Sequence, residues 1–232
     1  MQRDNQLPRE VPAVSAAIAE QARHMSLPLP STSICRRIRD IVTRFRPERL
    51  IEINASIGLV TSWLLSAQED HGFRPLSHHV LDRGGKFGVI LQRLIDRFDS
   101  PEHVHLRIAE YGALLAESRA SLTIANHQSH HLPKEVDMVI VDVMSHPDVS
   151  DVAVGLSHLR KGGLLIVVEP HEPAEDASKD EPSVIRFQSW IDLIHQEHDK
   201  RAIAFIPITG GILVGMQGQD TDEISSGIDN KP

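Results

Sequence analysis

The sequence predicts an α/β protein with a doubly wound, mostly parallel sheet that ends in an antiparallel hairpin. Apolar runs and amphipathic segments alternate along the chain, an order typical of strands connected by helices. The run at residues 138–141 is apolar at every position, as expected for a parallel strand that helices cover on both faces. The apolar segments 202–208 and 212–217 are joined by Thr209-Gly210-Gly211 alone, and so short a connection permits only an antiparallel hairpin.

The individual elements follow from local patterns. A short amphipathic helix is expected over residues 13–25, and Ser31–Ser33 can cap a second helix over residues 34–45, which Pro47 ends. Short apolar runs then predict five parallel strands, at residues 49–54, 79–81, 104–108, 136–142 and 164–168. Helices are expected between them, at residues 59–68, 89–98, 111–118 and 149–159, and Gly162-Gly163 is expected to end the last one.

The composition excludes several classes of protein. The chain has 232 residues with 24 Lys and Arg against 32 Asp and Glu, so its formal net charge is −8. This acidic balance, with 4% aromatic residues, argues against a nucleic-acid partner, which would need a basic face and often stacking rings. The single cysteine, Cys35, excludes an intramolecular disulfide and a cysteine-based zinc site.

One large domain with polar ends accounts for the whole chain. Residues 1–33 are expected to be an N-terminal segment that packs on the main domain, residues 34–217, and residues 218–232 to be a disordered acidic tail. The N-terminus has no apolar stretch of the kind found in secretory signals, and the longest apolar runs are too short to span a bilayer. We therefore expect a cytoplasmic protein without a membrane partner.

Acidic residues stand at the ends of all five predicted parallel strands, where ligands bind in open α/β sheets. They are Glu52, Asp82, Glu110, Asp142 and Glu169. A single acid at such a position is more often a helix cap, but five in this order favour a site. The carboxylate at the end of the second strand can accept hydrogen bonds from both hydroxyls of a ribose.

The turn after the first strand indicates a nucleoside ligand of a particular kind. Its small residues allow a ligand to approach the backbone, and the helix that follows offers free N–H groups. Asn54 and Ser56 occupy positions where a dinucleotide-binding turn has glycine, and only Gly58 remains. This pattern counts against NAD, and the absence of a G-K-[ST] sequence counts against a P-loop.

Several segments together resemble a known family. They are "RLIEINASIGLVTSW" at residues 49–63, "HHVLD", "VDMVIVD", "LRKGGLLIVVE" and the closing "FIPITGGILVGMQ". In order and spacing they resemble class I S-adenosylmethionine-dependent methyltransferases, and more narrowly the catechol/caffeoyl-CoA-type O-methyltransferases with their bacterial members, over residues 31–217. The resemblance implies a Rossmann-like, seven-stranded sheet whose last strand is antiparallel. It also implies S-adenosyl-L-methionine as cofactor, a small-molecule hydroxyl as methyl acceptor, and a homodimer.

The resemblance assigns cofactor contacts to particular residues. They are Glu52, Asn54, Ser56, Gly58, Asp82, Glu110, Tyr111 and Asp142. Asp82 falls on the acid that binds the ribose, and Glu110 and Tyr111 fall where the adenine is held. Asp142 falls on an acid that in the family binds a divalent metal and faces the cofactor.

Two departures from the family pattern affect the expected chemistry. The family's Asp-Asn metal pair after the fifth strand is replaced by Glu169-Pro170, so a divalent metal is not expected, although Glu169 and Asp142 could still bind a hard cation. The family's catalytic lysine is replaced by Ser145, with His146 beside it. We therefore expect Asp142 and His146 as the catalytic residues, since a histidine can act as a general base near neutral pH.

Two other functions remain open from the sequence. One is a catalytically inactive protein with the methyltransferase fold that binds the cofactor or a partner, which the missing lysine and Pro170 favour. The other is an NAD-dependent oxidoreductase, which the glycine-poor turn and the terminal hairpin disfavour.

Overall fold

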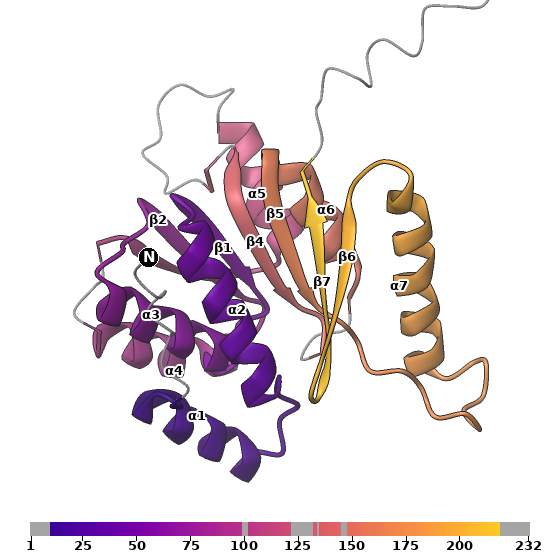
Figure 1. Cartoon of the computed structure of the whole chain (residues 1–232), viewed down its shortest axis with the longest axis horizontal. Coiled ribbons are helices and arrows are strands. Elements are labelled where there is room, and N and C mark those ends of the chain that lie inside the picture. The colour runs from indigo at the N-terminus through magenta and orange to yellow at the C-terminus, as the bar shows by residue number, and fades with distance from the viewer. Residues whose placement is uncertain (1–9, 99–101, 122–131, 134, 145–147, 219–232) are drawn as a thin grey trace, which may run out of the picture.

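A single seven-stranded sheet forms the centre of the molecule (Figure 1). The computed structural model describes residues 10–98, 102–121, 132–133, 135–144 and 148–218. Along the sheet the strands follow the order β3-β2-β1-β4-β5-β7-β6. Their bounds are Arg49–Ile53 (β1), Ser77–Asp82 (β2), Val104–Ile108 (β3), Val136–Asp142 (β4), Leu159–Val168 (β5), Ile203–Ile208 (β6) and Gly211–Gln217 (β7). The first five pair in parallel and β7 is antiparallel to both neighbours, which confirms the predicted fold class.

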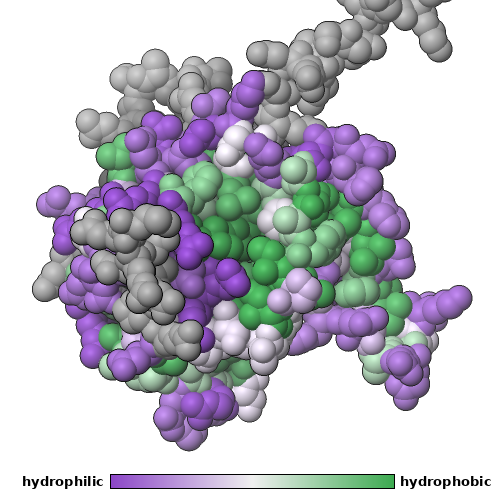
Figure 2. Space-filling view, viewed as in Figure 1, coloured by the Kyte–Doolittle hydropathy of each residue, from purple (hydrophilic) through white to green (hydrophobic). Residues whose placement is uncertain are grey.

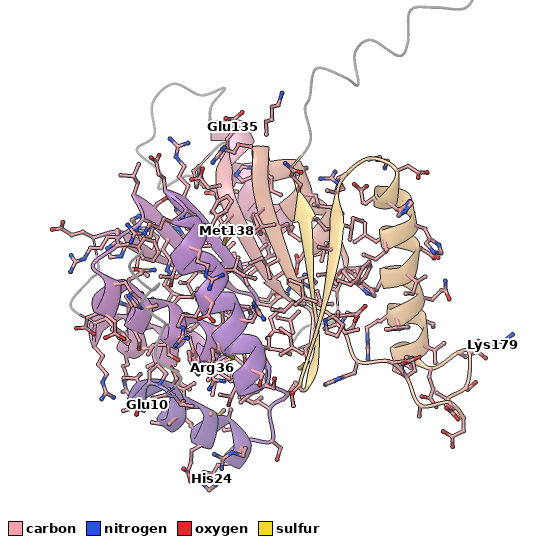
Figure 3. All side chains as sticks on the ribbon, viewed as in Figure 1. Glu10, His24, Arg36, Glu135, Met138 and Lys179 are labelled. Atoms are coloured by element: carbon pink, nitrogen blue, oxygen red, sulfur yellow. The ribbon has the colours of Figure 1, made fainter. Side chains whose placement is uncertain are left out.

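Helices cover both faces of this sheet. They are α1 (Ala13–His24), α2 (Thr32–Phe45), α3 (Leu59–His71), α4 (Gly85–Asp96), α5 (Tyr111–Ser121), α6 (Ser150–His158) and α7 (Pro182–His198). Side chains of α1, α2 and α3 share one core cluster with β1, β4, β5 and β7, while those of α5, α6 and α7 share another. Met138, labelled in Figure 3 near the middle of β4, is fully buried in the first cluster. The strands are thus apolar on both faces because both faces are covered.

Side-chain hydrogen bonds help to connect the N-terminal residues to the rest of the chain. The hydroxyl of Ser15 on α1 accepts a hydrogen bond from that of Ser62 on α3, at 2.9 Å. Ser31 caps α2 as expected, because its Oγ accepts from the backbone N–H of Ile34. The same Oγ donates to the carbonyl of Thr209, 2.6 Å away, and so ties the start of α2 to the tip of the β6–β7 hairpin.

The structure differs from the sequence prediction at β5. This strand begins at Leu159 rather than at residue 164, so Gly162-Gly163 lies inside a strand with irregular pairing instead of ending a helix. A Cβ on Gly163 would lie 2.9 Å from the carbonyl oxygen of Arg160 and 3.1 Å from those of Val136 and Asp137. Only glycine therefore fits at position 163, because the three backbone oxygens leave no room for a side chain.

One helix, α7, was not predicted. Its sequence carried two signals, a proline at the first helical position and apolar residues at Phe187, Trp190, Ile191 and Ile194. Trp190 is fully buried in the core between α7 and the sheet. None of the helices in the described part of the chain is long and apolar enough to cross a membrane. The expected tail lies outside the described residues, apart from Gly218.

Candidate functional site

The turn after β1 has backbone angles typical of glycine, although two of its three left-handed residues are not glycine. Asn54, Ser56 and Gly58 have φ angles of 63°, 54° and 88°, in the left-handed region. A non-glycine residue costs about 1–2 kcal/mol in this conformation, so the turn is strained at the first two positions. Only glycine fits at position 58, because a Cβ there would lie 2.5 Å from Leu94 Cδ2 and 2.9 Å from Leu91 Cδ2. The alternating left-handed residues present backbone N–H groups at the start of α3.

Asp82, the expected ribose acid, connects this turn to the next one. Its side chain is buried, with Oδ2 accepting from the backbone N–H of Ser56 at 2.8 Å and Oδ1 accepting from that of Gly84 at 2.9 Å. A carboxylate oxygen can accept more than one hydrogen bond. The two oxygens are therefore oriented by the backbone and keep acceptor capacity for the hydroxyls of a ligand.

Asn54 has one polar atom that the protein leaves unsatisfied. Its side-chain nitrogen donates to Asp151 Oδ2 at 3.2 Å and to the carbonyl of Asp142 at 3.4 Å. Its Oδ1 is buried and accepts no hydrogen bond from the described residues. A buried acceptor without a partner costs about 1–3 kcal/mol, so this atom is a position where a ligand with an N–H group would gain a hydrogen bond.

Acidic side chains line a small cavity at the carboxyl ends of β1 and β4. Its walls are formed by Leu29, Pro30, Glu52, Ile53, Asn54, Ala55, Ser56, Leu59, Val60, Ile140 and Asp142. No lysine or arginine is among these residues. With a volume of only about 10 Å³, the cavity has room for about one water molecule, and Leu29 and Pro30 from the segment before α2 form part of its wall.

The field in this cavity is negative. Burial raises the pKa of the Cys35 thiol well above its usual range, and the carboxylates of Asp142 and Glu52 raise it further. Asp142 is itself fixed by the backbone, since its Oδ1 accepts from the N–H of Met144 at 3.0 Å. Both oxygens of Glu52 lie 2.9 Å from Thr61 Oγ1 on α3, which donates to them. Carboxylates held in this way favour a cationic ligand.

The expected adenine contacts have different surroundings. The side chain of Glu110 is 59% exposed and forms an ion pair with Arg83, whose Nε lies 3.1 Å from Glu110 Oε2. Tyr111 is buried in the core cluster that also contains Leu81 and Val141. The structure thus places Glu110 at the site and Tyr111 in the layer beneath it.

Glu169 is directed away from Asp142, towards α7. Its Oε1 accepts a hydrogen bond of 2.8 Å from Trp190 Nε1. Burial raises the pKa of Glu169, and this hydrogen bond only partly opposes the rise. Pro170 offers no side-chain ligand atom, and the part of the chain that the structure describes contains no cluster of three or more His, Cys, Asp or Glu side chains that could hold a metal. The residues present therefore do not fit the family's metal site. Ser145 and His146 lie outside the described residues.

Arg83, which the sequence did not single out, forms three ion pairs at this edge of the sheet with described residues. Besides Glu110, it pairs with Asp148 Oδ2 at 3.0 Å and with Asp151 Oδ2. Burial alone would raise the pKa of Asp148, but hydrogen bonds from Ser150 and Arg83 outweigh it and hold that pKa below its usual range. The only signal in the sequence was a basic residue directly after the expected ribose acid.

Comparisons with known proteins agree with this architecture. No protein-family model and no curated protein matches the sequence. Among solved structures, the chain is similar to an O-methyltransferase from Bacillus cereus in complex with SAH, at 16% identity and a TM-score of 0.65, over 92% of this chain and 94% of the other. It is similar to the O-methyltransferase TomG from Streptomyces achromogenes in complex with SAM, at 15% identity and a TM-score of 0.63, over 90% and 91%. It is also similar to the SAH-bound methyltransferase PaMTH1 from Podospora anserina, at 11% identity and a TM-score of 0.65, over 90% and 89%.

These likenesses define the class of fold. The sheet order, the antiparallel β7 and the position of the site at the β1/β4 switch point are those of a Rossmann-like α/β protein. The chain therefore has the class I methyltransferase fold, in the form found in O-methyltransferases, as the resemblance of its motifs predicted.

Proposed function

We propose that the protein is an S-adenosylmethionine-dependent O-methyltransferase acting on a small-molecule hydroxyl. One observation supports this best: the cavity at the ends of β1 and β4 has carboxylates in its wall and an unsatisfied acceptor at Asn54, but no cationic side chain. S-adenosylmethionine carries a sulfonium and an ammonium group, which such a cavity attracts. The pyrophosphate of NAD would be repelled by Asp142 and Glu52.

Each residue of the proposed cofactor site has a distinct task. The buried Asp82 carboxylate would accept the two ribose hydroxyls, because the N–H groups of Ser56 and Gly84 already orient it. Asn54 Oδ1 would accept from the ammonium group. The cofactor supplies a methyl group on a positively charged sulfur, and the protein's contribution is to align the acceptor and receive its proton.

Asp142 is the described residue that we propose for the acceptor side. Its carboxylate is fixed at the end of β4 by the N–H of Met144, where it can orient a hydroxyl next to the sulfonium. His146 stays a proposal for the general base. The proposed mechanism uses no metal, because Glu169 is hydrogen-bonded to Trp190 and Pro170 provides no side-chain ligand atom.

Calorimetric titration with S-adenosylmethionine, S-adenosylhomocysteine and NAD tests the proposed cofactor. Both S-adenosyl ligands should bind and NAD should not. Asp142→Asn should weaken S-adenosylmethionine more than S-adenosylhomocysteine, by roughly fivefold, because only the former has the extra positive charge. Asp176→Asn removes the same charge from the exposed loop after β5 and serves as control. Tight binding of NAD, or an unchanged preference in Asp142→Asn, would contradict the proposal.

Methyl transfer itself needs a separate assay. Radiolabelled S-adenosylmethionine with a panel of catechols, phenols and aliphatic alcohols should label at least one acceptor class. Binding of the cofactor without transfer to any of them would support the inactive alternative instead.

We propose further that the protein is a cytoplasmic homodimer. An apolar groove of about 450 Å³ lies over β5, β7 and β6 beside α2, and none of its lining residues is charged (Figure 2). Phe45 at this groove is 38% exposed. A second copy could cover the groove through a two-fold contact. Light scattering should give twice the chain mass, and Ala204→Glu in the groove should reduce it to the monomer. Ile185→Glu on α7 should leave it unchanged.

A further inference from the structure

Arg83 joins four strand ends that are far apart in the sequence. It follows β2, and its guanidinium group contacts three different carboxylates. Nη1 and Nη2 donate to Asp148 and Asp151 at the start of α6, while Nε lies 3.1 Å from Glu110 after β3 in an ion pair without hydrogen-bond geometry. Asp151 in turn accepts from Asn54, in the turn after β1. The network therefore links the ends of β3, β2 and β1 to the first turn after β4.

The network lies at the crevice where ligands bind in open α/β sheets. The connections from β1 lead through β2 and β3 on one side of the sheet, while β4 starts the other side, so the crevice opens between β1 and β4. Arg83 crosses this crevice, because Glu110 belongs to one side and Asp151 to the other. One guanidinium group therefore contacts an acid on each side of the crevice.

Arg83 is not arranged to capture an anion. Its side chain is only 18% exposed, Nη1 and Nη2 already donate to carboxylates, and Nε lies 3.1 Å from the carboxylate of Glu110. Burial would lower its pKa, but the hydrogen bonds to Asp151 and Asp148 raise it. With Asp82 adjacent, the group contains one cation and four acids, so a phosphate would be repelled. The arginine therefore stays positively charged, and its contacts are ion pairs with acidic side chains of the protein.

We propose that Arg83 is a positioning residue that sets the width of the crevice for the adenosine half of the cofactor. This inference rests on the proposed function. Loss of Arg83 would leave Asp151, which is buried, with Asn54 as its hydrogen-bond partner among the described residues, and would release Glu110 and the start of α6. A lysine cannot replace it, because one ammonium group cannot reach three carboxylates from the fixed directions of a planar fork.

The test separates the two halves of the ligand. Wild type, Arg83→Lys and Arg83→Gln are titrated with S-adenosylhomocysteine, S-adenosylmethionine and adenosine alone. Both variants should bind all three ligands at least about tenfold more weakly, with the ratio between S-adenosylmethionine and S-adenosylhomocysteine unchanged, because the adenosine half is common to them. A residue important only for stability would lower the melting temperature without changing these affinities in the folded protein.

Two further variants keep the test decisive. Glu110→Gln removes only the most exposed partner, folds even where Arg83 variants do not, and should weaken adenosine by roughly two- to fivefold. Arg201→Lys breaks an ion pair of similar burial with Glu197 on α7 and should leave all affinities unchanged. The proposal is overturned if the Arg83 and Glu110 variants bind adenosine as wild type does, or if only ligands with a methionine half are weakened. Failure of wild type to bind any S-adenosyl ligand would instead refute the proposed function.

Discussion

The two halves of the site edge are built in different ways. Over β3, β2, β1 and β4, acidic side chains are held in place by backbone N–H groups or by partners from neighbouring strand ends, as with Asp82, Asp142 and Asp151. Over β5, β7 and β6, Glu169 is bound to a helix, and the loop at residues 170–181 is mostly exposed. Figure 3 shows Lys179 at the outer end of that loop, away from the sheet.

This difference indicates which half of the site edge binds the cofactor in a geometry that the fold determines. The first half contains the oriented acids and the strained turn that a nucleoside ligand needs, so we assign it to the cofactor. The second half offers a surface loop, a feature that changes readily without disturbing the sheet. The following experiments compare the two halves, beginning with the largest expected effect.

A methyl group added to each half should lower the free energy of unfolding by very different amounts. Gly58→Ala forces a left-handed alanine against Leu94 and Leu91 and should lower the free energy of unfolding by about 2–4 kcal/mol. Gly215→Ala on β7 would meet only Leu164, at an ordinary 3.7 Å, and should change it by less than about 1 kcal/mol. Urea unfolding measures both. Equal losses in the two variants would show that the first half is not the more tightly constrained one.

Removing one carboxylate from each half should affect ligand binding unequally. Asp82→Ala should weaken S-adenosylhomocysteine by about 1–3 kcal/mol, because it removes charged hydrogen bonds to the ligand. Glu169→Gln should leave the affinity within about twofold, since Glu169 is directed to Trp190. Calorimetric titration of both variants measures these affinities. An unchanged affinity in Asp82→Ala would mean that Asp82 is not part of the site.

The free energy of unfolding should depend on pH mainly through a histidine on β2, one of the strands assigned to the cofactor. Burial and, to a smaller extent, the positive neighbours together lower the pKa of His79 on β2 to about 3; these neighbours are His105, His78, Arg107 and His158. The unfolded chain, with a histidine pKa of about 6.5, binds this proton first, so stability falls as the pH drops below about 6.5. The loss should be about 2 kcal/mol between pH 6.5 and about pH 5.

Urea unfolding at several pH values tests this dependence. His79→Leu should remove most of the loss. His198→Leu, on the exposed end of α7, should retain it. A wild-type curve that stays flat over this range would contradict the assignment.

The smallest effect is expected from divalent metals. Magnesium or a chelator should change the affinity for S-adenosylhomocysteine by less than about twofold, because Glu169 and Asp142 face different partners. A reversible loss of binding in the chelator would mean that Glu169 leaves Trp190 to bind metal. Trp190→Phe, which frees Glu169, would then increase the metal affinity.

The sequence determined the fold class and the residues at the strand ends. Strands that are apolar on both faces, such as β4, and a hairpin with a very short connection are local patterns, and they define the sheet and its antiparallel end. The acid at the end of β2 and the glycine-like turn after β1 are also local. They could be found because each depends on residues that are adjacent in the chain.

The tertiary structure alone decided which of those residues act together. Arg83 pairs with acids 65 and 68 positions away, and Asn54 with one 97 positions away, and no spacing in the sequence predicts such contacts. The direction of Glu169 depends on Trp190, in a helix that the sequence analysis missed. A side chain's partner is set by how helices pack on the sheet, because packing brings distant segments together and the free energy of each contact depends on its final surroundings.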